Sequence, residues 1–139
     1  MKNWDAAIDC FQLLTKDLLY ATPHYPLANL GKAYYEKKEF AEAEKYYQEA
    51  LKMEPGFVNA LYGLGRTYLS MGQVQKASEY FQLSVEAAPL LAEAHFDLAN
   101  GYRLLGNIEK AKQVYARVIE LSPNSDLARE SKQALFNLK

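Results

Sequence analysis

Several residue types recur along this 139-residue chain at an interval of 34 residues. The recurring residues are Pro55, Pro89 and Pro123; Ala43, Ala77 and Ala111; Tyr34, Tyr68 and Tyr102; and Leu30, Leu64 and Leu98. Because independent residue types share one period, the chain is predicted to consist of stacked copies of one unit. Ala and Leu dominate the apolar residues while Val, Ile and Thr are scarce, which favours helices over strands. The expected fold is therefore an all-α solenoid.

The unit is clearest in the second complete copy, which reads Leu61-x2-Leu64-Gly65-x2-Tyr68, then Ala77-x3-Phe81, then Pro89. This pattern resembles the tetratricopeptide repeat, a helix-turn-helix unit of about 34 residues. The resemblance implies a right-handed superhelix that acts as a scaffold for protein–protein interaction. Such a scaffold would present a concave groove to a peptide or helix of a partner protein.

A single domain over 1–139 is expected, with three full repeats at 24–57, 58–91 and 92–125. Residues 1–23 align with the second helix of a truncated repeat and a loop, and 126–139 with a capping helix. Because the first segment lacks its partner helix, we expect the chain to begin inside a longer protein. Helices are predicted near 3–19, 24–37, 40–53, 58–71, 74–87, 92–105, 108–121 and 125–138.

Small residues are predicted to let the two helices of each repeat approach closely, at Gly31, Gly65 and Ala99. Tyr34, Tyr68 and Tyr102 are predicted to fill the space between the helices. A tight turn with a positive φ is expected at Gly72 and Gly106, because glycine adopts that conformation without strain. In the first repeat Lys38 takes this place, a departure expected to cost about 1 kcal/mol.

Charge and composition exclude several function classes. The chain has 16 basic and 17 acidic residues, so it lacks the basic surplus of a nucleic-acid binder. One cysteine and two histidines exclude an intrachain disulfide and disfavour a zinc site, and no cofactor is predicted. No apolar run reaches the roughly 18 residues that span a membrane. The compartment, cytoplasm or bacterial periplasm, stays open.

An enzyme is not expected. His95 takes the place of a large core residue and is predicted to pack at a helix interface. His24 begins a helix and is predicted to be exposed, and Cys10 is predicted to be a half-buried helical residue. None has neighbours in sequence that resemble a catalytic triad, and no glycine-rich phosphate loop follows a strand.

A second stripe on the first helix of each repeat is offset from the core stripe. In tetratricopeptide proteins this stripe lines the concave face, which gives ten candidate binding residues. They are Tyr25, Lys32, Tyr35, Asn59, Tyr62, Arg66, Leu69, Phe96, Asn100 and Arg103. Aromatic residues beside bases suit an apolar partner segment that carries an acidic group. The alternative is that these tyrosines only shield the helices from solvent.

One ligand class of the family is not expected here. Members that bind the acidic tails of large heat-shock chaperones hold two carboxylates with Lys and Asn in the first repeat, Asn in the second, and Lys and Arg in the third. The corresponding residues are Ala28, Lys32, Gly63, Glu93 and Asp97. Only Lys32 is basic, so binding of those tails is not predicted.

A narrower resemblance concerns Tyr20-x-Thr22-Pro23 and the following Ala28-Asn29-Leu30-Gly31. These segments are similar to tetratricopeptide lipoproteins that assist type IV pilus assembly at the bacterial outer membrane. The resemblance implies a role in pilus or other secretion and assembly machinery, although the lipid-bearing cysteine of those proteins is missing.

A competing hypothesis is self-association. Trp4, Ile8 and Phe11 recur at helical spacing on the first predicted helix, whose partner helix lies outside the chain. An uncovered apolar face there would bind a second copy, and the groove would then be incidental.

Overall fold

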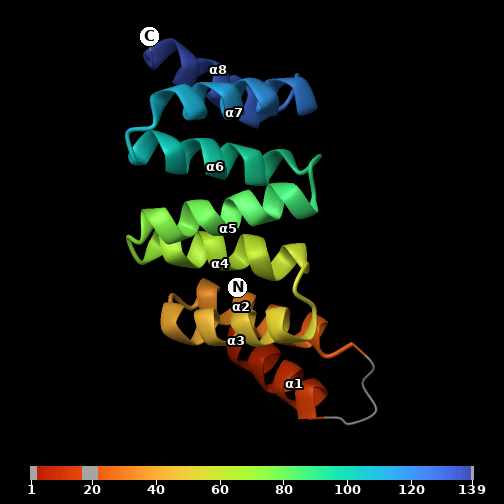
Figure 1. Ribbon diagram of the computed structural model, residues 1–139. Helices are drawn as coiled ribbons and strands as arrows, with labels where there is room; N and C mark the ends of the chain where they lie inside the picture. The colour runs from red at the N-terminus through yellow and green to blue at the C-terminus, as the bar shows by residue number, and fades with distance from the viewer. Residues whose placement is uncertain (1–2, 17–21, 139) are drawn as a thin grey trace. The chain divides into compact units, whose positions relative to one another are not determined.

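The computed structural model describes residues 3–16 and 22–138, and these form eight α-helices (Figure 1). The helices are α1 Trp4–Lys16, α2 His24–Glu36, α3 Phe40–Met53, α4 Val58–Ser70, α5 Val74–Ala87, α6 Ala92–Leu104, α7 Ile108–Leu121 and α8 Asp126–Asn137. The all-α prediction is confirmed, and α2 to α8 each begin and end within one residue of the predicted bounds. The predicted end of the first helix, at 19, lies outside the described residues.

The chain divides into two compact units, Met1–Gln73 with α1 to α4 and Val74–Lys139 with α5 to α8. The division falls inside the second expected repeat, 58–91. A single domain over 1–139 stays a prediction, and each unit is described by itself.

In the first unit α2, α3 and α4 pack against one another around Leu30, Leu64 and Tyr68, which are almost completely buried. The Tyr68 hydroxyl donates to Oε1 of Glu44 at 3.1 Å and accepts from Nε2 of Gln48 at 3.0 Å. This pairing removes the penalty of burying a phenol, because its polar atom stays hydrogen-bonded. Tyr68 is therefore a core residue, as predicted.

The other two tyrosines of that series are only half-buried. The Tyr34 ring stacks on Tyr46, with 5.3 Å between centroids and 3° between ring planes. Burial is the main cause that raises the pKa of Tyr34. The Tyr102 ring lies 5.5 Å from Nζ of Lys110, and its hydroxyl donates to Gln82. Tyr34 and Tyr102 therefore pack against the hydrophobic clusters of their units, as predicted, but only Tyr68 is almost completely buried.

Helix α1 packs on α2. Ile8 is 6% exposed and belongs to a cluster with Leu30 and Ala33, against which Trp4 and Phe11 are partly buried. The expectation of an uncovered apolar face is wrong for Ile8, because α2 of the same chain covers it. At the edge of this contact Nζ of Lys37 lies 2.6 Å from Oδ1 of Asp5, and this hydrogen bond raises the pKa of Lys37.

In the second unit α6, α7 and α8 pack around Leu98, Tyr115 and Val118. Helix α8 begins at a cap in which the Ser125 hydroxyl accepts from the Ala128 amide at 3.0 Å. This cap satisfies one of the amides that a helix N-terminus leaves unpaired. The other face of α8 carries exposed polar residues, Arg129, Lys132 and Gln133, as predicted for a capping helix.

Three residues with positive φ mark the turns between paired helices. Gly72 and Gly106 have φ values of 78° and 80°, and Lys38 has a φ of 63°. The prediction that Lys38 replaces a turn glycine is confirmed. A lysine in this region is strained, because its β-carbon crowds the neighbouring carbonyl oxygen.

Candidate functional site

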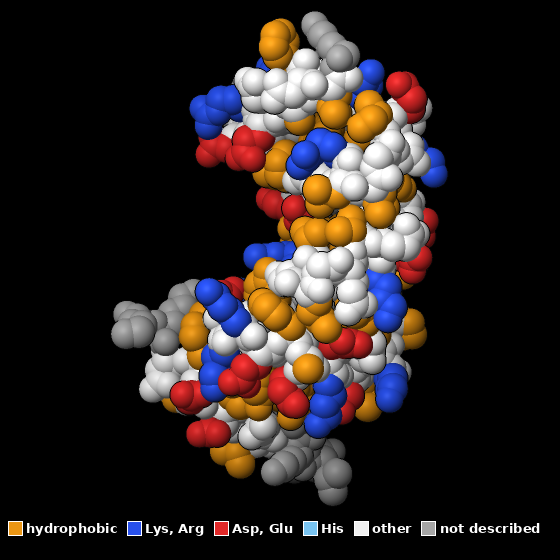
Figure 2. Space-filling model, turned by 90° about the vertical axis from the view of Figure 1, so that its left-hand side faces the viewer, with side chains coloured by type: hydrophobic (Ala, Val, Ile, Leu, Met, Phe, Trp, Pro, Cys, Tyr) orange, Lys and Arg blue, Asp and Glu red, His pale blue; other side chains and the backbone are white. Residues whose placement is uncertain are grey.

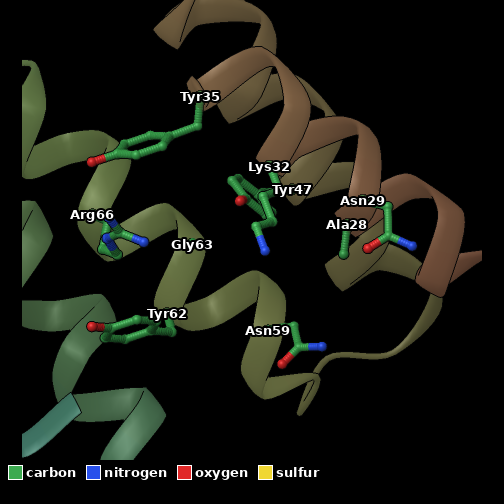
Figure 3. A pocket seen from close by; sticks show the side chains of 9 residues that line it. All are labelled: Ala28, Asn29, Lys32, Tyr35, Tyr47, Asn59, Tyr62, Gly63 and Arg66. Carbon is green, nitrogen blue, oxygen red and sulfur yellow. The ribbon is translucent and has the colours of Figure 1, made fainter. Parts of the chain in front are cut away.

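A hollow of about 310 Å³ lies among α2, α3 and α4 of the first unit (Figure 3). Its lining residues are Ala28, Asn29, Lys32, Tyr35, Tyr47, Asn59, Tyr62, Gly63 and Arg66. Of the seven candidate residues in this unit, the structure brings five together here, namely Lys32, Tyr35, Asn59, Tyr62 and Arg66. The other two, Tyr25 and Leu69, do not line it.

The guanidinium of Arg66 lies between two tyrosine rings. Its Cζ is 4.9 Å from the ring centroid of Tyr35 on α2 and 5.9 Å from that of Tyr62 on its own helix, one turn away. Figure 3 shows the two rings on either side of the arginine. The Tyr35 hydroxyl is also hydrogen-bonded to Oγ of Ser70, at 3.2 Å. These two cation–π contacts restrict the arginine side chain, so less freedom is lost when it binds a ligand.

The lining of this hollow carries two bases, Lys32 and Arg66, and no acid. Among residues 3–16 and 22–138, neither base has a carboxylate within ion-pair distance. Asn29 and Asn59 add amides that can both donate and accept. The hollow therefore offers aromatic surface together with uncompensated positive charge.

Tyr47 forms the floor of the hollow, and its ring lies between two glycines. A β-carbon at Gly31 would lie 2.8 Å from the ring, and one at Gly63 would lie 2.3 Å from it. The small residue predicted at Gly31 is thus required by close packing. Tyr47 is 5% exposed, and burial is the main cause that raises its pKa, while the nearby Arg66 lowers it.

Tyr47 is not among the ten candidate residues predicted from the helical stripe. A signal was available, because glycines on two successive first helices, at 31 and 63, mark a place where a large ring could fit. Asn29 was missed because it lies next to the stripe rather than on it.

Tyr25 instead belongs to an aromatic cluster with His24 and Phe57. Its ring centroid is 4.6 Å from that of His24 and 5.0 Å from that of Phe57, and the last two are 4.8 Å apart. Tyr25 does not line this hollow, because its ring packs on His24 and Phe57, and its part in partner binding stays a prediction. His24 is half-buried in this cluster, so the expectation that it is exposed is wrong.

A second hollow, of about 560 Å³, lies in the second unit and contains the remaining candidates, Phe96, Asn100 and Arg103. The Tyr115 hydroxyl donates to Oδ1 of Asn100 and accepts from Nε of Arg103, the latter at 3.2 Å. Helix α8 adds Glu130, Gln133, Ala134 and Asn137 to the lining, and Leu138 follows directly after the helix. These residues were not predicted, because the last helix was expected only to cap the repeats.

His95 and Cys10 lie outside both hollows. Nε2 of His95 is 2.8 Å from the carbonyl oxygen of Pro89, and the ring is half-buried, in keeping with packing at a helix boundary. Cys10 is exposed, so the expectation that it is half-buried is wrong.

The molecular surface mixes charges of both signs. On the face shown in Figure 2, acidic and basic side chains of the described residues alternate among apolar ones. Within the described part of the chain, the helices are too short or too polar to cross a membrane.

Three family models of the tetratricopeptide repeat match the chain, over residues 2–56, 34–95 and 92–125. Together with the helix pairs and the glycine-type turns, these matches establish that the chain belongs to the tetratricopeptide-repeat family. It has the fold of a protein-interaction scaffold. No curated protein sequence matches the chain at a significant level.

Three solved structures illustrate proteins with the same fold. The first tetratricopeptide domain of Spaghetti (RPAP3), bound to an HSP90 peptide, is 21% identical with a TM-score of 0.76 over 83% of this chain and 89% of that chain. The Sgt2 domain from Aspergillus fumigatus is 26% identical, with a TM-score of 0.73 over 83% and 76%. PilW, a type IV pilus biogenesis factor, is 25% identical, with a TM-score of 0.82 over 91% of this chain and 58% of PilW.

Proposed function

We propose that this protein is an interaction scaffold whose first-unit hollow binds a partner segment with apolar side chains and an acidic group. The observation that carries the proposal is Arg66, which is held between Tyr35 and Tyr62 and has no acidic partner among the described residues. The RPAP3 domain, whose fold is similar, binds a peptide. That likeness supports peptide binding as a use of this fold.

Tyrosine and arginine are the residue types that dominate binding free energy at protein interfaces. Tyr62 and Arg66 both line the hollow, and Lys32 adds a second positive charge on α2. An acidic group on the partner would be attracted before contact and would pair with a base after it. The aromatic rings would then cover the apolar part of the segment.

The acidic tail of HSP90 is not the partner that we propose. The family's chaperone clamp requires an asparagine at the position of Gly63, and the ring of Tyr47 occupies the space that such a side chain needs. Ala28 likewise takes the place of a clamp lysine. The partner therefore differs from the one bound by the RPAP3 domain.

A second, narrower proposal is that the partner belongs to type IV pilus or other secretion and assembly machinery. The likeness to PilW over 91% of this chain favours it. The sequence segment that first suggested this role begins at Tyr20, which lies outside the described residues. Self-association through Trp4 and Phe11 is the competing use, and the burial of Ile8 leaves less apolar surface for it. Light scattering over a range of protein concentrations would distinguish a dimer from a monomeric scaffold.

The test of the main proposal is a titration of variants against a partner isolated by affinity capture with the full chain. We expect Tyr62→Ala to weaken binding at least about tenfold with little change in melting temperature. Arg66→Glu should weaken binding further and reduce its dependence on salt. Tyr25→Ala is the matched control, because it removes an exposed tyrosine of the same unit that does not line the hollow. If Tyr62→Ala and Arg66→Glu both bind like the parent protein, this hollow is not the binding site.

A further inference from the structure

Two tyrosines at equivalent positions in the repeats, Tyr47 and Tyr115, differ in their hydrogen bonding. They lie two 34-residue periods apart, and both are buried on the second helix of a repeat. In the second unit the Tyr115 hydroxyl donates to the amide oxygen of Asn100 and accepts from Arg103. Its hydrogen-bonding capacity is met inside the protein.

The residues at the two partner positions are different in the first unit. Lys32 stands at the position of Asn100, and Tyr35 stands at the position of Arg103. A lysine ammonium donates hydrogen bonds and cannot accept one, so it cannot replace the asparagine oxygen. Tyr47 lines the hollow and is only 5% exposed. Among the described residues, nothing accepts a hydrogen bond from its hydroxyl.

Three donors therefore face the same space. Figure 3 shows Tyr47, Lys32 and Arg66 around the hollow. Burial raises the pKa of the Tyr47 phenol, so the hydroxyl keeps its proton and remains a donor near neutral pH. A group of donors without an acceptor fits an anionic oxygen ligand, because each donor gains a charge-assisted hydrogen bond.

We propose that the Tyr47 hydroxyl, Lys32 and Arg66 form a carboxylate-binding site at the base of the hollow. The inference rests on the proposed function and names the group that the hollow recognises. The carboxylate comes from an acidic side chain or the C-terminus of a partner peptide. The second unit supports a carboxylate in particular, because the acceptor that Tyr115 uses there is an sp² oxygen on a planar group.

The test uses the full chain and three short synthetic peptides as probes. The first is acetyl-Ala-Phe-Leu-Glu-Phe-Ala-amide, the second replaces Glu with Gln, and the third is the Gln peptide with a free C-terminal carboxylate. Binding is measured by NMR titration, which detects weak complexes. We expect at least one carboxylate peptide to bind fivefold or more tightly than the Gln amide peptide. The peptide that gains affinity identifies the source of the carboxylate.

Tyr47→Phe removes only the hydroxyl and leaves the ring between Gly31 and Gly63. We expect it to reduce the preference for a carboxylate, which is the affinity of a carboxylate peptide divided by that of the Gln amide peptide, to less than twofold. Tyr46→Phe is the matched control, because the neighbouring residue on α3 lies outside the hollow. Lys32→Asn restores the acceptor found in the second unit, so it should abolish the preference and raise the melting temperature by a few degrees, whereas Lys32→Ala should not raise it.

The outcomes separate this inference from the proposed function. If all three peptides bind equally and Tyr62→Ala weakens them, the carboxylate site is wrong and the peptide-binding hollow stands. The same conclusion follows if Tyr47→Phe keeps the full carboxylate preference. If the peptides bind and Tyr62→Ala has no effect, or if none of the peptides binds, both the site and the hollow's function are wrong.

Discussion

The ring of Tyr47 lies so close to the backbone of Gly63 that a β-carbon at residue 63 would come within 2.3 Å of it. The contact joins α3 to α4 within the first unit and sets the depth of the hollow. It also explains why this hollow differs from a chaperone clamp, since any larger residue at 63 would displace its floor.

Gly63→Ala should therefore destabilise the protein by about 1–3 kcal/mol, because overpacking forces a ring or a helix to move. Urea unfolding followed by circular dichroism would measure the change. Gly56→Ala is the control, because a β-carbon there meets nothing within 4 Å and should change the free energy of unfolding little. Equal stability of the two variants would contradict the packing described here.

Lys38→Gly should stabilise the protein by about 0.5–1 kcal/mol. Glycine relieves the strain of a lysine with a φ of 63°, although the more flexible unfolded chain offsets part of the gain. Gly72→Ala, at a φ of 78°, should instead destabilise the protein by a similar amount. Thermal unfolding of both variants tests the pair, and a loss of stability in Lys38→Gly would show that the turn is not strained.

Tyr68→Ala should destabilise the protein by about 3–5 kcal/mol, because it leaves a large cavity and removes the partner of Glu44 and Gln48. Tyr68→Phe should cost less, about 0.5–1.5 kcal/mol, since only the hydrogen bonds are lost. Tyr62→Ala, at a half-buried residue of the same helix, provides the comparison. Urea midpoints that rank Tyr62→Ala as the most damaging of the three would refute the assignment of Tyr68 to the core.

The stability of the protein should fall in alkaline solution. The pKa of Tyr47 is raised above its ordinary value of 10.0 in the folded protein, chiefly by burial, so the unfolded chain releases this proton first. The stabilisation is complete below pH 10 and is lost as the pH rises from there towards the folded pKa. One such proton changes the free energy of unfolding by about 1.4 kcal/mol per pH unit. Urea unfolding at pH 9 and 11 should show a smaller loss for Tyr47→Phe than for the parent protein.

The repeat period predicted the fold well, because each helix and each turn has characteristic residues at fixed positions in the sequence. The spacing of the prolines and tyrosines located the helices, and Lys38 was recognised as a turn residue from its register alone. The burial of Ile8 was not predicted, because the repeat period does not show which side of α1 packs against α2.

The lining of the hollow was only partly predictable. A helical stripe shows which side of a helix a residue lies on, but it does not show which residues of other helices that side chain contacts. Lys32, Tyr62 and Arg66 lie where the stripe placed them. Tyr25 shares the stripe, yet its ring packs on Phe57, a tertiary contact without a signal in the period. The role of Tyr47 in the floor depends on two glycines whose approach to one ring appears only when three helices are packed together.

The hydrogen bond between Tyr115 and Asn100 has a consequence for how tandem copies diverge. Asparagine and lysine codons differ at a single base, and the two residues occupy the same register position on the first helix of a repeat, Asn100 on α6 and Lys32 on α2. A point mutation at this register position can therefore convert a repeat that satisfies its own tyrosine into one that needs an acceptor from another molecule. Gene duplication supplies the helices, and the new specificity arises while the buried residues that fold the repeat stay unchanged.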